Sequence, residues 1–353
     1  MTMILNSMLA RRVLTYCFAL LWCVSVAAAA EPAESGEQTN VTVDNFVRAE
    51  SDHMFRANMK AFQVRFGEFT HLREPTTPDN QPVIRMNQDT LYTAMVLDLS
   101  EPVQITLPEI DGRYQSMQVI NQDHYMFVEA TPGTYELTEE AVGTRFAQVS
   151  IRTFADPTDP DDVSQAHAAQ DAIVVEGGGA GPFEAPDWDR EALAVGRRAL
   201  SDFAAALGME ASRAFGRKDE VEPTAYLIGA AAGWGGLPAS AAMYVMDSVS
   251  DNDGTTPYKV TVGEVPVDGF WSVTIYNAEG YLEANDLGVN SYNSVTAEQN
   301  DDGSTTIHMG ACDDGRVNCI PISPGWNYAL RMYEPRADIL DGSWTFPAFE
   351  VAD

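Results

Sequence analysis

The chain has 353 residues, of which 45% are hydrophobic, and its formal net charge at pH 7 is −31. This length leaves room for one large or two ordinary domains with a packed core. A surface this negative repels nucleic acid and anionic lipid head groups, so neither is an expected partner. The acidic residues are spread along the chain, which is typical of a solvated surface and not of a disordered acidic tail.

The first 30 residues have the pattern of a cleavable secretory signal peptide. Arg11 and Arg12 form a positive flank, the apolar run 13–26 follows, and small residues lead to a predicted cleavage after Ala30. The apolar run is shorter than the about 20 residues of a membrane span. We therefore predict a periplasmic or secreted protein with no lipid anchor and no stable membrane insertion after signal cleavage.

The first module is predicted at 44–175, after a polar linker at 31–43. Apolar residues within 44–66 recur at helical spacing, which predicts a helix with Asp44 as its N-cap. Three prolines then make 74–82 a loop.

The rest of this module is predicted to be β-rich. Apolar and polar residues alternate there in short runs, as in β-strands. The first run places Leu91, Met95, Leu97 and Leu99 on one face. The predicted strands lie at 89–100, 102–108 and 113–121, and a loop at 156–162 closes the region.

The middle of the chain, 176–248, is predicted to be a linker followed by a helical segment. A Gly/Pro-rich stretch opens it, and apolar residues at helical spacing predict a helix that stops at Gly208. The small-residue stretch 229–238 is expected to be a loop that holds Trp234. This side chain could be a pocket lid or a core plug, and the sequence favours neither.

The last module, 249–353, is again predicted to be β-rich, with short strands separated by turns such as the one at 300–303. Cys312 and Cys319 are the cysteines that remain after signal cleavage, and they bracket a Gly-containing turn. In an oxidising compartment this arrangement predicts a disulfide. A metal site would need further Cys or His ligands at suitable spacing, and only His308 is near.

Two sets of motifs resemble known bacterial families. NQDTLYTAMVLDL and DGRYQSMQVINQDHY resemble the domain-of-unknown-function family 1254. PVDGFWSVTIYNAEGY, DDGSTTIHMGACDDGRVNCIPISPGWNYALRMYEP and ILDGSWTFP resemble its usual companion, family 1214. The resemblance implies an α+β, β-rich fold: an N-terminal β domain with flanking helices, a helical middle segment and a jelly-roll-like C-terminal β-sandwich. It implies no function, since both families were named for lacking one.

Known catalytic and cofactor motifs are absent from the sequence, including G-x-S-x-G, H-E-x-x-H, C-x-x-C and the P-loop. The segment at 251–254 resembles part of an EF-hand but lacks carboxylates at the required positions. Asp156, Asp159 and Asp161 could hold a divalent cation from a loop, yet Asp–Pro turns give the same pattern. We favour the turn and predict no metal and no cofactor.

Polar residues at the start of the first strands are the N-terminal site candidates. Asn87 and Asp89 enter the first strand, which also carries Tyr92, and Arg113 opens a neighbouring strand. Asp89 and Arg113 could form a buried ion pair that holds the domain. They could instead face a cavity, where Arg113 binds an anionic group and Asp89 acts as an acid or base. We favour the scaffold, because buried networks of this kind are more often structural.

Two predicted C-terminal strands each carry one apolar face and one polar, aromatic-bearing face. The polar faces hold Tyr276 on the strand at 270–277, and Arg331 and Tyr333 on the strand at 327–335. If they line one concave side of a sandwich, these residues suit a sugar or a small polar ligand. Otherwise they form the solvated outer face that antiparallel sheets commonly have.

Three classes of function follow. The chain could be a hydrolase or lyase that acts on a saccharide-like or small polar substrate through carboxylate and tyrosine acid-base chemistry. It could be a non-catalytic binding module for an envelope glycan or an exported metabolite, or a structural envelope protein. The candidate catalytic residues are Asp89, Asp98, Asp123 and Tyr276. The candidate ligand-binding residues are Asn87, Tyr92, Arg113, Trp234, Arg331 and Tyr333. The sequence leaves the oligomeric state open.

Overall fold

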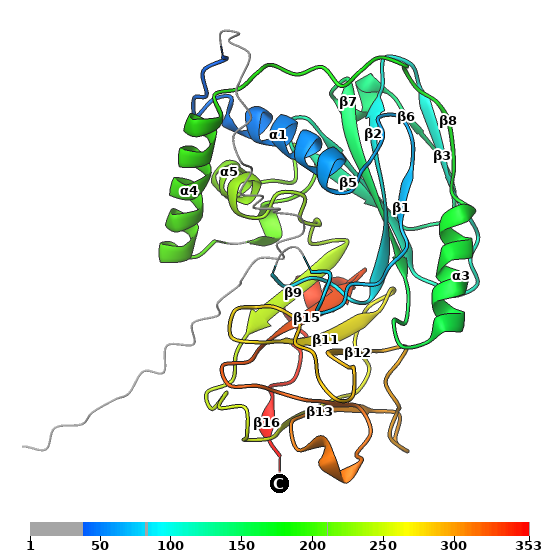
Figure 1. Ribbon diagram of the computed structural model, residues 1–353, viewed down its shortest axis with the longest axis vertical. Coiled ribbons are helices and arrows are strands. Elements are labelled where there is room, and N and C mark those ends of the chain that lie inside the picture. Colours follow the sequence, from blue (N-terminus) through cyan, green and yellow to red (C-terminus); the bar gives the residue numbers. More distant parts are fainter. Residues whose placement is uncertain (1–37, 82–83, 210, 353) are drawn as a thin grey trace, which may run out of the picture.

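The computed structural model describes residues 38–81, 84–209 and 211–352. The predicted signal peptide at 1–30 and most of the linker lie outside the described residues. The described chain forms four β-sheets with helices packed against them, so the predicted β-rich α+β class is confirmed. Figure 1 shows two β modules, one above the other, with a group of helices on one side of the upper one. None of the helices described here is long and apolar enough to cross a membrane.

The N-terminal module is a sandwich of two antiparallel sheets. Alternation in the predicted strand at 89–100 places Met95, Leu97 and Leu99 in the core between these sheets. The five-stranded sheet has the order β1 (Thr70–Leu72), β2 (Thr90–Asp98), β7 (Phe146–Phe154), β4 (Gln115–Asn121) and β5 (Met126–Glu129). The three-stranded sheet has the order β6 (Gly133–Leu137), β3 (Val103–Leu107) and β8 (Val174–Gly177).

The central strands β2 and β7 are buried along their whole length. An antiparallel sheet commonly leaves one face to solvent, so here both faces must be covered. One face packs on the three-stranded sheet. On the other face, Val96 contacts a helical cluster that includes Phe55, whereas Phe154 packs on Phe270 and Tyr333 of the C-terminal module.

Three helices form the side layer of the N-terminal module and contact one another (Figure 1). They are α1 (Phe46–Ala61), α4 (Arg190–Leu207) and α5 (Pro223–Ala232). The predicted helix stop at Gly208 is confirmed. Asp44 is not the N-cap of α1, because the residue before the helix is Asn45, whose side chain instead accepts a hydrogen bond from the Thr42 amide.

The predicted loops at 156–162 and 229–238 are each partly helical. Four residues of the second loop belong to α5, because small side chains there let Gly229 pack closely on Ala214 and Phe215. The first loop contains the start of α3, where Asp159 is the N-cap and accepts from the Asp161 amide. The remaining helices are α2 (Glu139–Val142), α3 (Pro160–Asp171), α6 (Ala337–Leu340) and the 3-10 turns η1 (Ala211–Arg213) and η2 (Cys312–Asp314).

The C-terminal module is also a sandwich, built from two four-stranded sheets around one apolar core. One sheet has the order β12 (Ser291–Asn293), β11 (Trp271–Tyr276), β15 (Asn327–Tyr333) and β9 (Ala242–Asp247). The other has the order β14 (Cys319–Ile320), β13 (Thr305–Met309), β10 (Tyr258–Val262) and β16 (Glu350–Val351). Strand β9 pairs with β15 although it precedes the predicted boundary at 249, so the C-terminal module begins earlier than expected.

The predicted disulfide between Cys312 and Cys319 is confirmed, with the two Cα atoms 5.6 Å apart. It closes the turn that joins β13 to β14 and lies at the far end of the C-terminal module from the N-terminal sheets (Figure 1). The bridge therefore stiffens a loop and takes no part in the contact between the modules.

Candidate functional site

The polar face of the C-terminal sheet is covered and not solvated. Its central row runs across four strands in register, Tyr244 on β9, Arg331 on β15, Ser272 on β11 and Asn293 on β12. Arg331 is only 3% exposed, and Ser272 is fully buried. The row faces the N-terminal module, as the packing of Tyr333 against Phe154 and Tyr114 shows. The alternative of a solvated outer face therefore does not hold, because the N-terminal module covers that side.

The Arg331 guanidinium is held in place by three hydrogen bonds. It donates to the Thr274 hydroxyl at 2.8 Å, to the Arg85 carbonyl at 3.0 Å and to the Tyr276 hydroxyl at 2.6 Å. Tyr276 in turn donates to the Met86 carbonyl at 2.8 Å. Because Arg85 and Met86 belong to the N-terminal module, this network ties the two modules together.

Arg152 lies opposite, on the central strand β7 of the N-terminal sheet. It is 1% exposed and sits between Tyr92 on β2 and Ser116 on β4. Its Nη1 atom donates to the Gln118 side chain at 3.1 Å, and its guanidinium carbon lies 5.6 Å from the Tyr92 ring centroid. Its Nε atom is buried without a hydrogen-bond partner. Within 38–81, 84–209 and 211–352, no carboxylate forms an ion pair with Arg152.

The surroundings of Arg152 are aromatic. Burial alone would lower the pKa of Arg152, but four nearby tyrosines outweigh burial and raise it. Burial raises the pKa of Tyr244 to about 12, so this phenol stays protonated at neutral pH. Arg152 therefore keeps its charge, and the Tyr244 phenol near it is neutral. Removing such a charge from water without a counter-ion costs several kcal/mol. The four tyrosines are Tyr92, Tyr244, Tyr333 and Tyr114.

Asn87 and Asp89 stand at the entry to β2, where the two modules meet. The Asp89 Oδ1 atom accepts from Ser291 and Asn293 of the C-terminal sheet, each at 3.2 Å. The Asn87 side chain donates to the Tyr333 hydroxyl at 3.0 Å. The second carboxylate oxygen of Asp89 is buried and has no hydrogen-bond partner.

Among the described residues, four of the nine buried polar side-chain atoms without hydrogen-bond partners lie between the two modules. Most buried polar groups in proteins are hydrogen-bonded, so each exception needs an explanation such as an absent ligand, water or ion. Four of the exceptions here lie on the two facing rows or beside them. They are Asp89 Oδ2, Arg152 Nε, the Tyr244 hydroxyl and the Ser272 hydroxyl.

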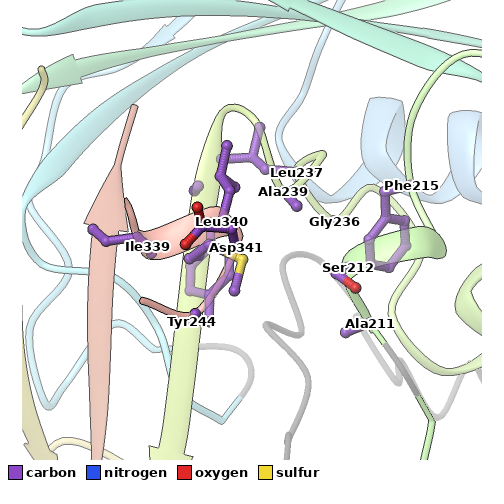
Figure 2. Close-up of a pocket in the computed structure, with 13 residues that line it drawn as sticks. Ala211, Ser212, Phe215, Gly236, Leu237, Ala239, Tyr244, Ile339, Leu340 and Asp341 are labelled. Atoms are coloured by element: carbon purple, nitrogen blue, oxygen red, sulfur yellow. The ribbon is translucent and has the colours of Figure 1, made fainter. Parts of the chain in front are cut away.

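Two cavities adjoin this interface. A void of about 10 Å³ lies beside Arg152, lined also by Gln118, Gln148, Ser150 and Trp234, and it has room for about one water molecule. A pocket of about 310 Å³ lies between the helical segment around Phe215, the start of the C-terminal sheet and α6 (Figure 2). Its size is at the lower end of the range for ligand sites.

The structure gathers six of the predicted site residues at the interface between the modules. They share hydrogen bonds, a ring contact or the same strand face. These residues are Asn87, Asp89, Tyr92, Tyr276, Arg331 and Tyr333.

The other predicted acids and Arg113 lie elsewhere. Asp98, at the opposite end of β2, binds the Arg145 guanidinium at 2.9 Å, and this contact lowers the pKa of the Asp98 carboxyl to about 2. Asp123 accepts from Arg48 at 2.8 Å on α1.

Arg113 does not pair with Asp89. It binds the Asp162 carboxylate through two hydrogen bonds, of 2.6 and 3.0 Å, and the Phe154 carbonyl at 2.7 Å. The correct partner therefore comes from α3, which the sequence did not place near the strand.

Trp234 is a core plug and not a lid. It is 1% exposed, its Nε1 atom donates to Ser51 at 3.1 Å, and its ring stacks on His124 with the centroids 5.4 Å apart. His124 also accepts from the Gly235 amide at 2.9 Å, so both residues fix the Gly-rich loop to the sheet.

The aspartates of the 156–162 segment have structural partners. Asp159 caps α3, Asp162 binds Arg113, and Asp156 accepts from the amide and hydroxyl of Thr158. The described part of the chain contains no cluster of three or more His, Cys, Asp or Glu side chains suited to a metal ion.

Sequence reasoning missed Arg152, Tyr244 and Gln118. A signal was present for Arg152, since Gln148, Ser150 and Arg152 alternate with Val149 and Ile151 on β7. No local pattern revealed that another module covers this polar face.

Two protein-family models match the chain, and both are described as proteins of unknown function. DUF1254 matches residues 66–140 and DUF1214 matches residues 240–337. These are the two families that the motifs resemble, in the same order, so the resemblance is confirmed. No curated protein sequence matches the chain.

Solved structures include similar chains. The crystal structure of the VPA0106 protein from Vibrio parahaemolyticus has a TM-score of 0.65 and 18% sequence identity, and the match covers 88% of this chain and 100% of that chain. An uncharacterized protein from Burkholderia cenocepacia has a TM-score of 0.47 and 15% identity, with 88% of each chain covered. At this level of identity the Vibrio structure supports the β-rich fold alone.

Proposed function

We propose that the chain is an exported binding protein for a small anionic ligand, which Arg152 holds between the two modules. One observation carries the proposal: a fully buried guanidinium has no carboxylate partner among the described residues and an unpaired Nε atom. A fold gains nothing from such a charge by itself, because its desolvation is not repaid. A bound carboxylate or similar anion would supply the missing charge and the missing hydrogen bonds.

Binding fits the geometry better than hydrolysis does. Asp98 and Asp123 are engaged by Arg145 and Arg48 and lie away from the interface. A glycoside hydrolase of the common type needs two carboxyl groups that flank one substrate bond. Asp89 is the one predicted catalytic acid in the interface cluster. A purely structural envelope role would leave the pocket and the missing counter-charge of Arg152 without an explanation.

Export is part of the proposal. The N-terminal pattern is that of a signal peptide, and the Cys312–Cys319 disulfide suits an oxidising compartment. Expression of the full chain followed by cell fractionation tests this directly. We expect a shortened, disulfide-bonded protein in the periplasm or the medium, and an uncleaved protein in the cytoplasm would contradict export.

The binding function is tested by native mass spectrometry of the protein purified from periplasmic extract. We expect a mass above that of the chain, which dissociates in the gas phase to release a small anion. Arg152→Met should lose this added mass. Arg198→Met, on the exposed side of α4, is the matched control and should keep it. An added mass that Arg152→Met retains would contradict the proposal.

A second function, catalysis on the same small polar ligand, is favoured by the unpaired Asp89 oxygen near the tyrosines. Such a carboxylate could act as a general base. Incubating the extracted ligand with fresh protein tests this by mass spectrometry. An enzyme would convert the ligand and Asp89→Asn would abolish conversion without abolishing binding, whereas an unchanged ligand would leave binding as the function.

A further inference from the structure

The pocket of about 310 Å³ beside the interface has mainly apolar walls. Phe215, Leu237, Met243, Ile339 and Leu340 line it (Figure 2). Asp341 is the one ionisable acid or base of its lining apart from Tyr244, and the neighbouring Ser343 lowers the pKa of the Asp341 carboxyl, so that it is ionised at neutral pH. The pocket thus offers contact area for an apolar body and repels a second negative charge.

Tyr244 connects this pocket with the Arg152 cluster. Its half-buried ring lines the pocket, while its hydroxyl is buried and has no hydrogen-bond partner. Tyr244 is also the strand neighbour of Arg331 and one of the tyrosines that act on Arg152. A phenol placed this way presents a donor from the inner wall of the pocket.

The Gly-rich loop makes a second connection. Gly236 lines the pocket, and its carbonyl accepts from Gln118 at 3.1 Å. The same glutamine accepts from Arg152 at 3.1 Å. Gln118 therefore links the inner wall of the pocket to the Arg152 guanidinium through one hydrogen bond on each side.

We infer that the ligand of the proposed binding function is an amphiphilic monocarboxylate, such as an aryl acid or a short acyl chain acid. Its apolar body occupies the pocket, and its carboxylate meets the Tyr244 hydroxyl with Arg152 behind it. A polyhydroxylated sugar fits less well, because hydroxyl groups against the apolar walls would lose hydrogen bonds to water without replacement. This inference depends on the proposed function and narrows it to one ligand class.

Calorimetric titration of the purified, ligand-free chain tests the class. The probes are phenylacetate, hexanoate and octanoate, with phenylacetamide as the neutral analogue and glucuronate as the sugar acid. We expect at least one apolar acid to bind about tenfold or more tightly than phenylacetamide and glucuronate. The interface variant Arg152→Met should lose this binding.

Leu340→Trp fills the pocket from a side chain that is 45% exposed, so the fold should tolerate it. The substitution should weaken binding of the apolar acid about tenfold or more. Leu207→Trp, on α4 at 71% exposure, is the matched control and should bind as the unaltered chain does.

The outcomes separate the inference from the proposed function. Binding of glucuronate but of no apolar acid, lost in Arg152→Met, would overturn the ligand class and leave the anion site intact. Binding of an apolar acid that Leu340→Trp does not weaken would overturn the pocket assignment. Absence of binding by every anion tested would overturn the inference, and the native mass measurement decides separately whether the proposed function also fails.

Discussion

Two regions of the molecule bury charged side chains in opposite ways. Beside the helices, fully buried Glu50 on α1 meets Arg197 of α4 through two hydrogen bonds of 2.7 Å. Between the modules, Arg152 and Arg331 are equally buried, yet no carboxylate of the described chain forms an ion pair with either. The first region pairs its buried charge directly with a carboxylate, whereas in the second region Asp89 acts on Arg331 from a distance and neither arginine has a direct carboxylate partner among the described residues.

The two interface arginines also differ from each other. Arg331 makes three hydrogen bonds and ties the modules together, so it serves as scaffold. Arg152 makes one described hydrogen bond and leaves its Nε atom unpaired. A buried charge that has neither an ion pair nor a full set of hydrogen bonds lowers the stability of the fold. Such a loss of stability is typical of binding sites.

The largest expected change in the free energy of unfolding comes from breaking the buried ion pair between Glu50 and Arg197. Arg197→Met leaves Glu50 buried without its partner, which should destabilise the protein by about 3–5 kcal/mol. Burial already raises the pKa of Glu50, so the loss should shrink at lower pH, where Glu50 takes up a proton. Urea unfolding measures this. Arg198→Met, one residue away and exposed, should change stability by about 0.5 kcal/mol or less.

Replacing an arginine by methionine at the interface should change the free energy of unfolding in the opposite direction. Arg152→Met removes an uncompensated charge, so the ligand-free protein should become more stable by about 1–2 kcal/mol. Unfolding of ligand-free protein in urea gives the value. A loss of more than about 1 kcal/mol would show that Arg152 is scaffold like Arg331.

The protonation of His53, on α1, should make the stability of the protein depend on pH. Burial, and then the guanidinium groups of Arg197, Arg190 and Arg56, lower the pKa of His53 from 6.5 to about 4. Between these values the unfolded chain binds the proton and the folded chain does not, so stability falls as pH falls, by about 1.4 kcal/mol per pH unit.

His53→Gln removes this contribution. The difference in unfolding free energy between the unaltered chain and the variant should be constant above about pH 7 and should shrink by about 1.4 kcal/mol per unit below about pH 6. The acids of α1 contribute to both proteins and largely cancel. A difference that does not change with pH would show that His53 titrates normally in the fold.

The smallest expected effect concerns one hydroxyl. Tyr244→Phe removes a buried donor that has no partner, so the ligand-free protein should gain up to about 1 kcal/mol. Tyr276→Phe is the matched contrast, because it breaks hydrogen bonds with Arg331 and Met86 and should cost about 1–3 kcal/mol. Thermal unfolding of both variants checks the signs, and a loss in Tyr244→Phe would mean that its hydroxyl is satisfied.

The strands and the polar C-terminal face could be predicted because two-residue alternation is a local signal. That signal placed Tyr276, Arg331 and Tyr333 on their strands correctly. It could not show what covers their face, since the covering residues come from the N-terminal module, far away in the sequence.

The same limit explains the remaining errors. Asp89 and Arg113 are neighbours in the predicted strand pattern, but in the structure Arg113 binds Asp162 on α3. Arg152 became a candidate only when packing of the modules showed that it is buried without a counter-charge. Burial and pairing are properties of the tertiary structure, so the proposed binding site, which is defined by a mismatch between them, has no local motif.

The most direct test of the account is a crystal structure of the protein purified from periplasmic extract, examined at Arg152. We expect a bound anion within hydrogen-bond distance of the Arg152 guanidinium, with its remaining atoms toward the pocket beside Tyr244. An Arg152 whose every nitrogen is satisfied by protein groups, in protein that binds no anion, would contradict it.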